Sequence, residues 1–197
     1  MYGLASRVDN DIAAKRIYEI KGRGFASPLP ILLDSEVSLA QYCPYVNSLS
    51  RKLAQEFWPG ALTIVLRKNE EICDSATGGL ATAGFRVPAS QVTRRICSLV
   101  GGAVTGTSAN KTGLPSAKSA QEAFSQLKDS SLDLIIDGGS TQSDTASTVI
   151  DCTDDVVTVL RLGAISVSSL REVLGNDVQF KEGIYFFAGP NKSRSSK

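Results

Sequence analysis

Residues 103–128 read AVTGTSANKTGLPSAKSAQEAFSQLK and contain a predicted strand, a loop and a predicted helix in direct succession. The first five residues combine apolar and β-branched side chains in the way that is typical of a strand. Ser119 and Glu122 have the spacing of a capping box, in which both side chains accept hydrogen bonds from backbone N–H groups at a helix start. We therefore predict a helix to about Lys128 and a connecting loop over residues 106–119.

The same alternation of strands and helices continues along the chain in both directions. Short apolar runs predict strands at residues 29–33, 61–66, 83–87, 132–136, 147–151 and 156–160. Helical spacing and caps predict a helix at about residues 10–21, between Asn10 and Gly22, and a second from about Val46 to the residue before Trp58. A third helix is predicted to start at Ser90, with Val92, Ile96 and Leu99 facing inward, and a last one at Ser169. Because strands and helices interleave, we predict an α/β fold with a twisted, mostly mixed open sheet and flanking helices.

The domain organisation is predicted to be simple. The sequence shows no internal repeat and no linker, and 197 residues are enough for one stable core. We predict one domain over residues 1–175 and a C-terminal extension over residues 176–197, whose last residues, GPNKSRSSK, are polar and expected to be disordered. Hydrophobic residues make up 42% and charged residues 21%, which are the values of ordinary soluble folds.

The overall charge does not indicate a nucleic-acid or membrane partner. The formal net charge is +1, so any such surface must be a local patch. No apolar run is long enough to span a bilayer, and the N-terminus MYGLASRVDN has neither an apolar signal core nor an Arg/Ser-rich presequence. We therefore expect no membrane partner and a cytoplasmic location, or a mitochondrial or plastid one if a leader precedes this sequence.

Two residue types exclude whole classes of chemistry. The chain has no histidine, which excludes Ser-His-Asp and Cys-His catalytic groups. The four cysteines, Cys43, Cys73, Cys97 and Cys152, lack C-x-x-C spacing, so we expect no zinc site and interpret them as reduced, mostly buried thiols. No metal-binding residue is therefore predicted in this chain.

Hydrogen-bond donors and positive charge gather in several loops and strand ends. They include Lys21, Arg23, Ser27, Thr82, Arg86, Ser108, Asn110, Ser116, Ser147 and Arg161. Most of these residues lie at strand ends or in the loops just after them, at the edge where open α/β sheets bind ligands. Glycine lets backbone N–H groups approach an anion, hydroxyls donate further hydrogen bonds, and Lys or Arg neutralises the charge. The shared chemistry predicted for these segments is recognition of phosphate or carboxylate.

Each segment also has an ordinary structural interpretation. A loop of Gly, Ser, Thr and Asn is most often only a loop, and the helix dipole alone favours Lys21 at a helix end. Arg86 is harder to dismiss, because an arginine between Phe85 and Val87 in a strand needs an anionic partner if it is buried. Neither a P-loop nor a glycine-rich dinucleotide motif occurs, so standard nucleotide motifs do not account for these loops.

Nine short segments occur together in one order. They are Tyr2-Gly3-Leu4, Ile20-Lys21-Gly22-Arg23, Pro28-Leu29, Trp58-Pro59-Gly60-Ala61-Leu62-Thr63, Phe85-Arg86-Val87-Pro88, Ser108-Ala109-Asn110 with Gly113-Leu114-Pro115-Ser116, Asp137-Gly138-Gly139, Ser147-Thr148-Val149 and Arg161-Leu162-Gly163-Ala164-Ile165. In this order they resemble the YrdC family of threonylcarbamoyl-adenylate synthases, from Tyr2 to about Leu174. Each motif is short, but nine in the same order are hard to obtain by chance.

The resemblance implies a fold and an activity. Members of the family have a twisted α/β fold that is also seen in dihydroxybutanone-phosphate synthase. They combine L-threonine, bicarbonate and ATP into threonylcarbamoyl-AMP and pyrophosphate, and a partner system transfers the threonylcarbamoyl group to an adenosine of certain tRNAs. Mg²⁺ is expected with ATP, and no tightly bound cofactor is expected.

The resemblance also implies roles for individual residues. By position, the residues that match family contacts to ATP are Arg23, Ser27, Thr82, Ser108, Ser116 and Arg161, and Asn110 joins them through the S-x-N signature around the nucleotide. Arg86 and Ser147 match contacts to threonine, with Arg86 expected at its carboxylate. Lys21 and Arg23, from the K-x-R signature, are the residues we expect to be catalytic.

This sequence departs from the family pattern, most clearly at its start. Members begin with a glycine-rich turn and a strand that ends in Pro-Thr-(Asp/Glu)-Thr before the equivalent of Met1, and one of those threonines would contact the substrate. We therefore expect a fragment, a shortened isoform or a misplaced start, with unpaired backbone and exposed apolar surface in the sheet. Gly24 replaces a proline, which loosens its loop, Leu32 stands where some members have a histidine, and Ser27 where many have an asparagine.

Three functions remain open at this stage. The full set of ATP-side residues favours an active synthase. The absent first strand, with the basic residues Arg51, Lys52, Arg67, Lys68, Arg94, Arg95, Lys111 and Lys118, would suit a non-catalytic nucleotide- or RNA-binding protein on the same fold. A carbon-backbone enzyme like dihydroxybutanone-phosphate synthase is less favoured, because that chemistry needs clustered acids at a metal.

Overall fold

The computed structural model describes residues 1–25, 27–141, 146–175 and 180–182. Its strands are β1 (Gly3–Leu4), β2 (Ile31–Leu33), β3 (Leu62–Arg67), β4 (Thr82–Arg86), β5 (Ala103–Thr105), β6 (Thr107–Ser108), β7 (Thr148–Asp151), β8 (Val157–Arg161) and β9 (Phe180–Glu182). Its helices are α1 (Asp11–Lys21), α2 (Leu39–Tyr42), α3 (Ser48–Phe57), α4 (Asp74–Thr77), α5 (Gln91–Leu99), α6 (Ala120–Leu127) and α7 (Val167–Leu174). Among them no helix is long and apolar enough to cross a membrane.

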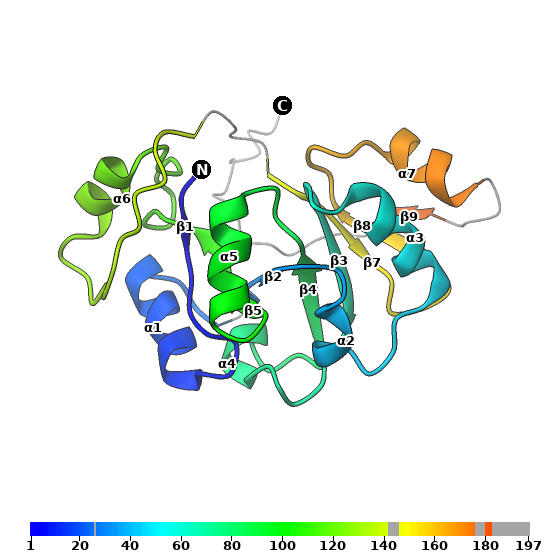
Figure 1. Cartoon of the computed structure of the whole chain (residues 1–197), viewed down its shortest axis with the longest axis horizontal. Helices are drawn as coiled ribbons and strands as arrows, with labels where there is room; N and C mark the ends of the chain where they lie inside the picture. The colour runs from blue at the N-terminus through cyan, green and yellow to red at the C-terminus, as the bar shows by residue number, and fades with distance from the viewer. Residues whose placement is uncertain (26, 142–145, 176–179, 183–197) are drawn as a thin grey trace, which may run out of the picture.

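Seven of the described strands form one sheet in the order β5-β2-β4-β3-β7-β8-β9 (Figure 1). Neighbouring strands alternate between antiparallel and parallel pairing, because β2 pairs with β4, β3 with β7 and β8 with β9 in parallel, whereas the other three pairs are antiparallel. β1 and β6 form a separate antiparallel pair. This arrangement confirms the predicted α/β class and its mixed sheet.

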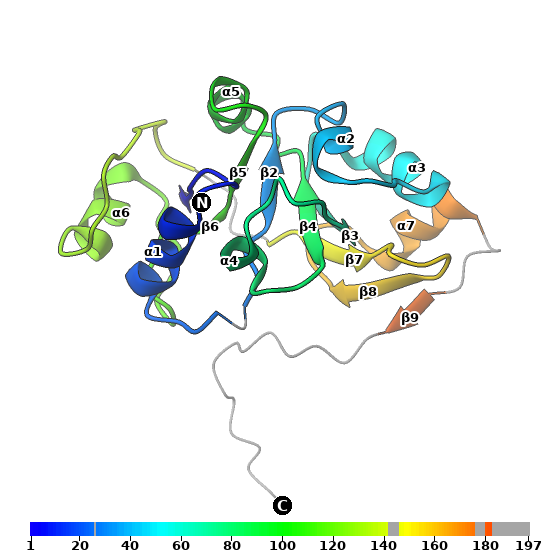
Figure 2. The same cartoon turned by 90° about the horizontal axis from the view of Figure 1, so that it is seen from below.

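The two faces of the sheet differ in what covers them. Helices α2, α3, α5 and α7 lie along one face, while α1, α4 and α6 gather at the end of the sheet near β2 and β5 (Figure 2). Burial along β4 alternates accordingly: Ala83 and Phe85 are buried under the helices, and Thr82, Gly84 and Arg86 are only partly buried on the opposite face. None of the described helices lies over this opposite face, which we call the open face.

Helix α1 ends in a way that fixes two of the candidate residues. The side chain of Asn10 accepts a hydrogen bond from Ala13 N at the start of the helix. Gly22 adopts the left-handed conformation (φ 61°), which is why a glycine suits the end. The N–H of Arg23 donates to Tyr18 O over 3.1 Å, so the chain folds back on the helix as it leaves. Both predicted limits of this helix, Asn10 and Gly22, are confirmed.

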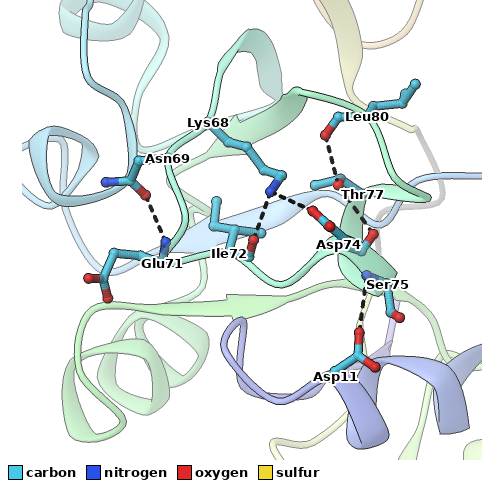
Figure 3. Close-up of polar contacts among 9 residues, drawn as sticks. All are labelled: Asp11, Lys68, Asn69, Glu71, Ile72, Asp74, Ser75, Thr77 and Leu80. Atoms are coloured by element: carbon cyan, nitrogen blue, oxygen red, sulfur yellow. Dashed lines mark hydrogen bonds and ion pairs between the residues drawn. The ribbon is translucent and has the colours of Figure 1, made fainter.

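Polar contacts hold the connection between β3 and β4, which contains α4 (Figure 3). The ammonium of Lys68 donates to Ile72 O over 2.9 Å and contacts an Asp74 carboxylate oxygen at 3.0 Å. The N–H of Ser75 donates to the Asp11 carboxylate over 3.3 Å, which ties α4 to the start of α1. These contacts position the start of β4, where Thr82 lies.

One predicted strand is absent. The sequence predicts a strand over residues 132–136, but no described strand pairs with this segment, and its backbone makes no hydrogen bond to the rest of the described chain. Leu134 and Ile136 are 73% and 48% exposed. A strand is defined by pairing, so an apolar β-branched run without a neighbour stays irregular.

Two helices differ from their predicted details. Val92 and Leu99 of α5 were predicted to face inward but are 49% and 68% exposed. Cys97 is instead the buried residue of this helix, and its thiol donates to Leu32 O over 3.3 Å. For α7, the cap is Ser166, whose hydroxyl accepts from Ser169 N, so the helix starts earlier than Ser169. The predicted disorder of the last residues lies outside the described part of the chain.

Candidate functional site

Lys21 joins the end of α1 to the loop of residues 106–119. Its side chain is buried, and its ammonium donates to Ser108 O over 2.6 Å and to Asn110 O and Asn110 Oδ1 over 3.0 Å each. The Ser108 hydroxyl lies 3.3 Å away. Burial, and secondarily the nearby Arg23, lowers the pKa of Lys21 to about 8. In this structure the lysine therefore organises the loop, while the Ser108 and Asn110 side chains are fixed around it.

Other contacts secure the same loop. The Asn110 side-chain amide donates to Leu114 O, and Thr112 N donates to Lys21 O over 3.1 Å. The backbone N–H of Tyr2 donates to Ala117 O, and Tyr2 O accepts from Ala109 N, so the N-terminal segment runs beside the loop. Gly106 packs closely on Leu32, since a Cβ there would lie 2.5 Å from Leu32 Cδ1 and would force that side chain to move. Ser116, predicted to contact ATP, lies within this braced loop and is partly exposed.

Arg23, Ser27 and Thr82 lie near this loop at one end of β2 and β4. One guanidinium nitrogen of Arg23 donates to Ser27 O over a long 3.4 Å, and its Nε is buried without a partner among the described residues. β2 and β4 are parallel, with Ile31 opposite Phe85, so the same register places Thr82 beside the chain that leaves Ser27. Burial lowers the pKa of Arg23.

Arg86, Ser147 and Arg161 form a second group, at the other end of β4. Arg86 Nε donates to Gly60 O over 2.6 Å. Arg161 donates to Ser147 O from Nε and Nη2 over 3.1 and 2.8 Å, and from Nη2 to the Ser147 hydroxyl over 3.0 Å. That hydroxyl lies 2.9 Å from the buried Thr63 hydroxyl. The serine thus connects the start of β7 to β3 and β8.

The electrostatics of this second group favour an anion. Burial, and secondarily the neighbouring Arg161, lowers the pKa of Arg86, and burial lowers that of Arg161. Neither arginine forms an ion pair within residues 1–25, 27–141 and 146–175. Two neighbouring cations that repel each other are stabilised by a carboxylate or phosphate placed between them.

The two groups share the open face of the sheet. Thr82 and Arg86 project from the same side of β4 and are four residues apart, which is about 13 Å in a strand. Gly84 lies between them on that side and leaves the strand bare. The arrangement can bind an elongated anionic ligand, or two anionic ligands that meet above the sheet. Two hollows of about 220 and 300 Å³ lie elsewhere, and none of the predicted site residues lines either one.

A family model for Sua5, YciO and YrdC proteins, described as telomere recombination, matches residues 1–163. This chain belongs to the Sua5/YciO/YrdC family. It is 34% identical over 185 residues to threonylcarbamoyl-AMP synthase of Pyrococcus abyssi, covering 94% of this chain and 54% of the relative. It is 33% identical to the Bacillus subtilis threonylcarbamoyl-AMP synthase, covering 89% of this chain and 51% of the relative. The chain thus spans about half the length of these curated relatives.

Solved structures of the Sua5/YciO/YrdC family have the same fold. The P. abyssi Sua5 complex with L-threonine superposes with a TM-score of 0.83 at 34% identity, covering 91% of this chain and 52% of that one. YciO of Escherichia coli superposes with a TM-score of 0.72 at 25% identity, covering 86% and 82%. The resemblance inferred from nine short motifs and the predicted fold are therefore confirmed, whereas the domain limits and the residue roles stay predictions.

Within this family fold, the structure groups the predicted residues into two sets. Lys21, Ser108 and Asn110 are in direct contact, and Arg161 contacts Ser147. No metal ligand can be named, since the described residues contain no group of three or more Cys, Asp or Glu side chains placed to hold an ion. Sequence reasoning missed Tyr18, which packs against Arg23, because a tyrosine on the apolar side of a helix has the pattern of an ordinary core residue.

Proposed function

We propose that this chain carries the active site of a threonylcarbamoyl-AMP synthase, which forms threonylcarbamoyl-AMP and pyrophosphate from L-threonine, bicarbonate and ATP. The observation that carries the proposal is the pair of arginines, Arg86 and Arg161, beside Ser147. Neither arginine has an acidic partner in the described chain, so the pair suits a bound carboxylate or phosphate. The names of the relatives, and the L-threonine bound to P. abyssi Sua5, support the same substrate class.

The proposed reaction requires little proton transfer by side chains of the protein. The neutral amino group of threonine bonds through its nitrogen to the bicarbonate carbon. The bicarbonate hydroxyl leaves as water with one proton from that nitrogen, and a carbamate remains. A carbamate oxygen then bonds to the α-phosphorus of ATP, while the bond from that phosphorus to the oxygen bridging to the β-phosphate breaks. Pyrophosphate leaves. Anionic reactants must be held together, so positioning and electrostatic stabilisation supply the catalysis.

The residues divide this work according to their positions. Arg86 would bind the threonine carboxylate, and Ser147 would orient the same substrate from its place just before β7. Arg23, together with the loop fixed by Lys21, would hold the phosphates of ATP. The predicted ATP contact Arg161 donates to the predicted threonine contact Ser147, so the two substrates would meet at this hydrogen bond. Mg²⁺ would arrive with ATP and offset phosphate charge, and we assign it no protein ligand.

Product formation tests the proposal directly. The 197-residue chain is incubated with ATP, Mg²⁺, bicarbonate and L-threonine, and threonylcarbamoyl-AMP is measured by mass spectrometry, with a no-threonine control. A second form, with the family's N-terminal strand added before Met1, is assayed beside it. Product from either form supports the proposal, and product from the extended form alone shows that the added strand completes the site. No product from both would overturn the proposal.

Transfer to tRNA would then require a partner system, and we keep the cytoplasm as the expected compartment. The competing RNA-binding function is less favoured, because its basic residues are spread over α3, the end of β3, α5 and the loop of residues 106–119. Electrostatic RNA binding strengthens as salt is lowered. Tight, salt-dependent binding of tRNA by a chain that forms no product would favour this second function.

A further inference from the structure

Tyr18 is a buried aromatic residue beneath a functional arginine. Its side chain is 1% exposed, and the Arg23 Cζ atom lies over the ring, 5.4 Å from its centroid. The Phe25 ring packs against it with centroids 4.7 Å apart and planes inclined at 46°. Arg23 therefore lies over the Tyr18 ring, whose position Phe25 supports, and this geometry is typical of a cation–π contact.

The backbone enforces the same approach. Gly22 turns the chain in the left-handed conformation, and Arg23 N then donates to Tyr18 O over 3.1 Å. One backbone hydrogen bond and one ring contact thus connect the same two residues. The turn therefore starts the Arg23 side chain beside the Tyr18 ring, and the ring contact sets where the guanidinium lies.

Two polar atoms at this contact, one from each residue, have no hydrogen-bond partner in the described part of the chain. Arg23 makes only the long bond to Ser27 O, its Nε is buried without a partner in the described chain, and no acid pairs with it there. The Tyr18 hydroxyl is also buried without a partner among the described residues. The ring face, rather than the hydroxyl, is therefore the part of Tyr18 that acts on Arg23.

We propose that Tyr18 is a positioning residue, whose ring face holds the Arg23 guanidinium in the orientation that receives the phosphates of ATP. This inference rests on the proposed function. The proposal predicts that ATP binding needs the Tyr18 ring but not its hydroxyl. A residue that only fills the core would not affect ATP binding in this way. Any effect on nucleotide binding must pass through Arg23.

The first test separates ring from hydroxyl. Tyr18→Phe should bind ATP as the wild type does, whereas Tyr18→Leu should bind ATP about tenfold more weakly, which lies between the sizes expected of an exposed and of a desolvated cation–π contact. The affinity for threonine should not change. In an Arg23→Ala background, Tyr18→Leu should cause no further loss, because a positioning residue acts through its partner. Tyr42→Leu, at another buried tyrosine, should reduce stability without changing ATP affinity.

A second measurement tests the geometry without any ligand. In the wild type, NMR should show nuclear Overhauser contacts between the Arg23 side chain and the Tyr18 ring, and an Arg23 Nε–H signal shifted by the ring current. That shift should persist in Tyr18→Phe and vanish in Tyr18→Leu, or in Tyr18→Met if the leucine variant does not fold. Absent contacts, or additive losses in the double variant, would overturn the inference. Intact contacts in a chain that makes no threonylcarbamoyl-AMP would instead count against the proposed function.

Discussion

At the scale of single residues, Lys21 is a charged group in a place that disfavours charge. Its ammonium faces carbonyl, hydroxyl and amide oxygens from two loop residues, but its burial lowers its pKa to about 8. The folded chain therefore releases this proton at lower pH than the unfolded chain, whose lysines titrate near 10.4. Between these two values the unfolded state binds more protons, so the contribution of Lys21 to stability rises with pH.

Replacing Lys21 by methionine removes this titration while keeping an apolar stem of similar length. We expect the wild type to gain free energy of unfolding relative to Lys21→Met as the pH rises from 7.5 to 10, on the order of 3 kcal/mol at most. The measurement is urea unfolding of both chains at several pH values. Both chains contain the same cysteines, whose buried thiols have raised pKa values and lower the free energy of unfolding as the pH rises. Taking the difference between the two chains removes this cysteine contribution. A constant difference would show that Lys21 is not desolvated.

Residue types could be read from the sequence, but their contacts could not. The lack of histidine and the recurrence of Lys, Arg and hydroxyls indicated an anion site, and Arg86 stood out because of its apolar neighbours. The sequence did not indicate that Arg161 would bond to Ser147, because these residues come from strands whose pairing depends on the whole sheet. Tyr18 was missed because helical periodicity marks burial and does not reveal what a buried ring touches.

At the scale of elements, local patterns predicted strands and helices well and predicted their surroundings less well. β3 and β4 were expected from short apolar runs and are confirmed close to their predicted limits. In α5, the spacing of Val92 and Leu99 shows only that they share a face, and the direction in which the chain enters the helix decides which face meets the sheet. Residues 132–136 have the composition of a strand, yet pairing also needs a neighbour.

The unpaired segment 132–136 should promote self-association. Its backbone groups make no hydrogen bond within the described chain, and the exposed Leu134 lies beside a hollow of about 300 Å³. Edges with unpaired backbone pair with other chains. We expect Leu134→Lys to reduce association in light scattering across a range of protein concentrations. Val37→Lys, at an 84% exposed valine of another region, is the matched control and should change little. Equal effects of both substitutions would indicate a general effect of charge.

At the scale of the whole molecule, the fold places its core on one side of the sheet and its polar chemistry on the other. Helices bury residues such as Ile64 and Phe85, while Thr63 and Arg86 from the same strands lie on the open face. Open α/β sheets bind ligands where strand ends leave such space. Bound substrates would therefore cover a surface that the described helices leave bare. Their binding should depend on contacts between residues of different strands, such as the hydrogen bond from Arg161 to Ser147.

The bond between Arg161 and Ser147 should couple the two substrates. ATP that engages Arg161 would fix Ser147 for threonine, so ATP should raise the affinity for threonine about fivefold or more, and threonine should raise that for ATP equally. Calorimetric titrations without bicarbonate measure this, because no product can form. Ser147→Ala should remove most of the coupling while ATP alone still binds, and Ser98→Ala, on the exposed side of α5, should preserve it. Coupling that survives in Ser147→Ala would mean that the substrates communicate through another contact, and its absence in the wild type would mean that the two sites act independently.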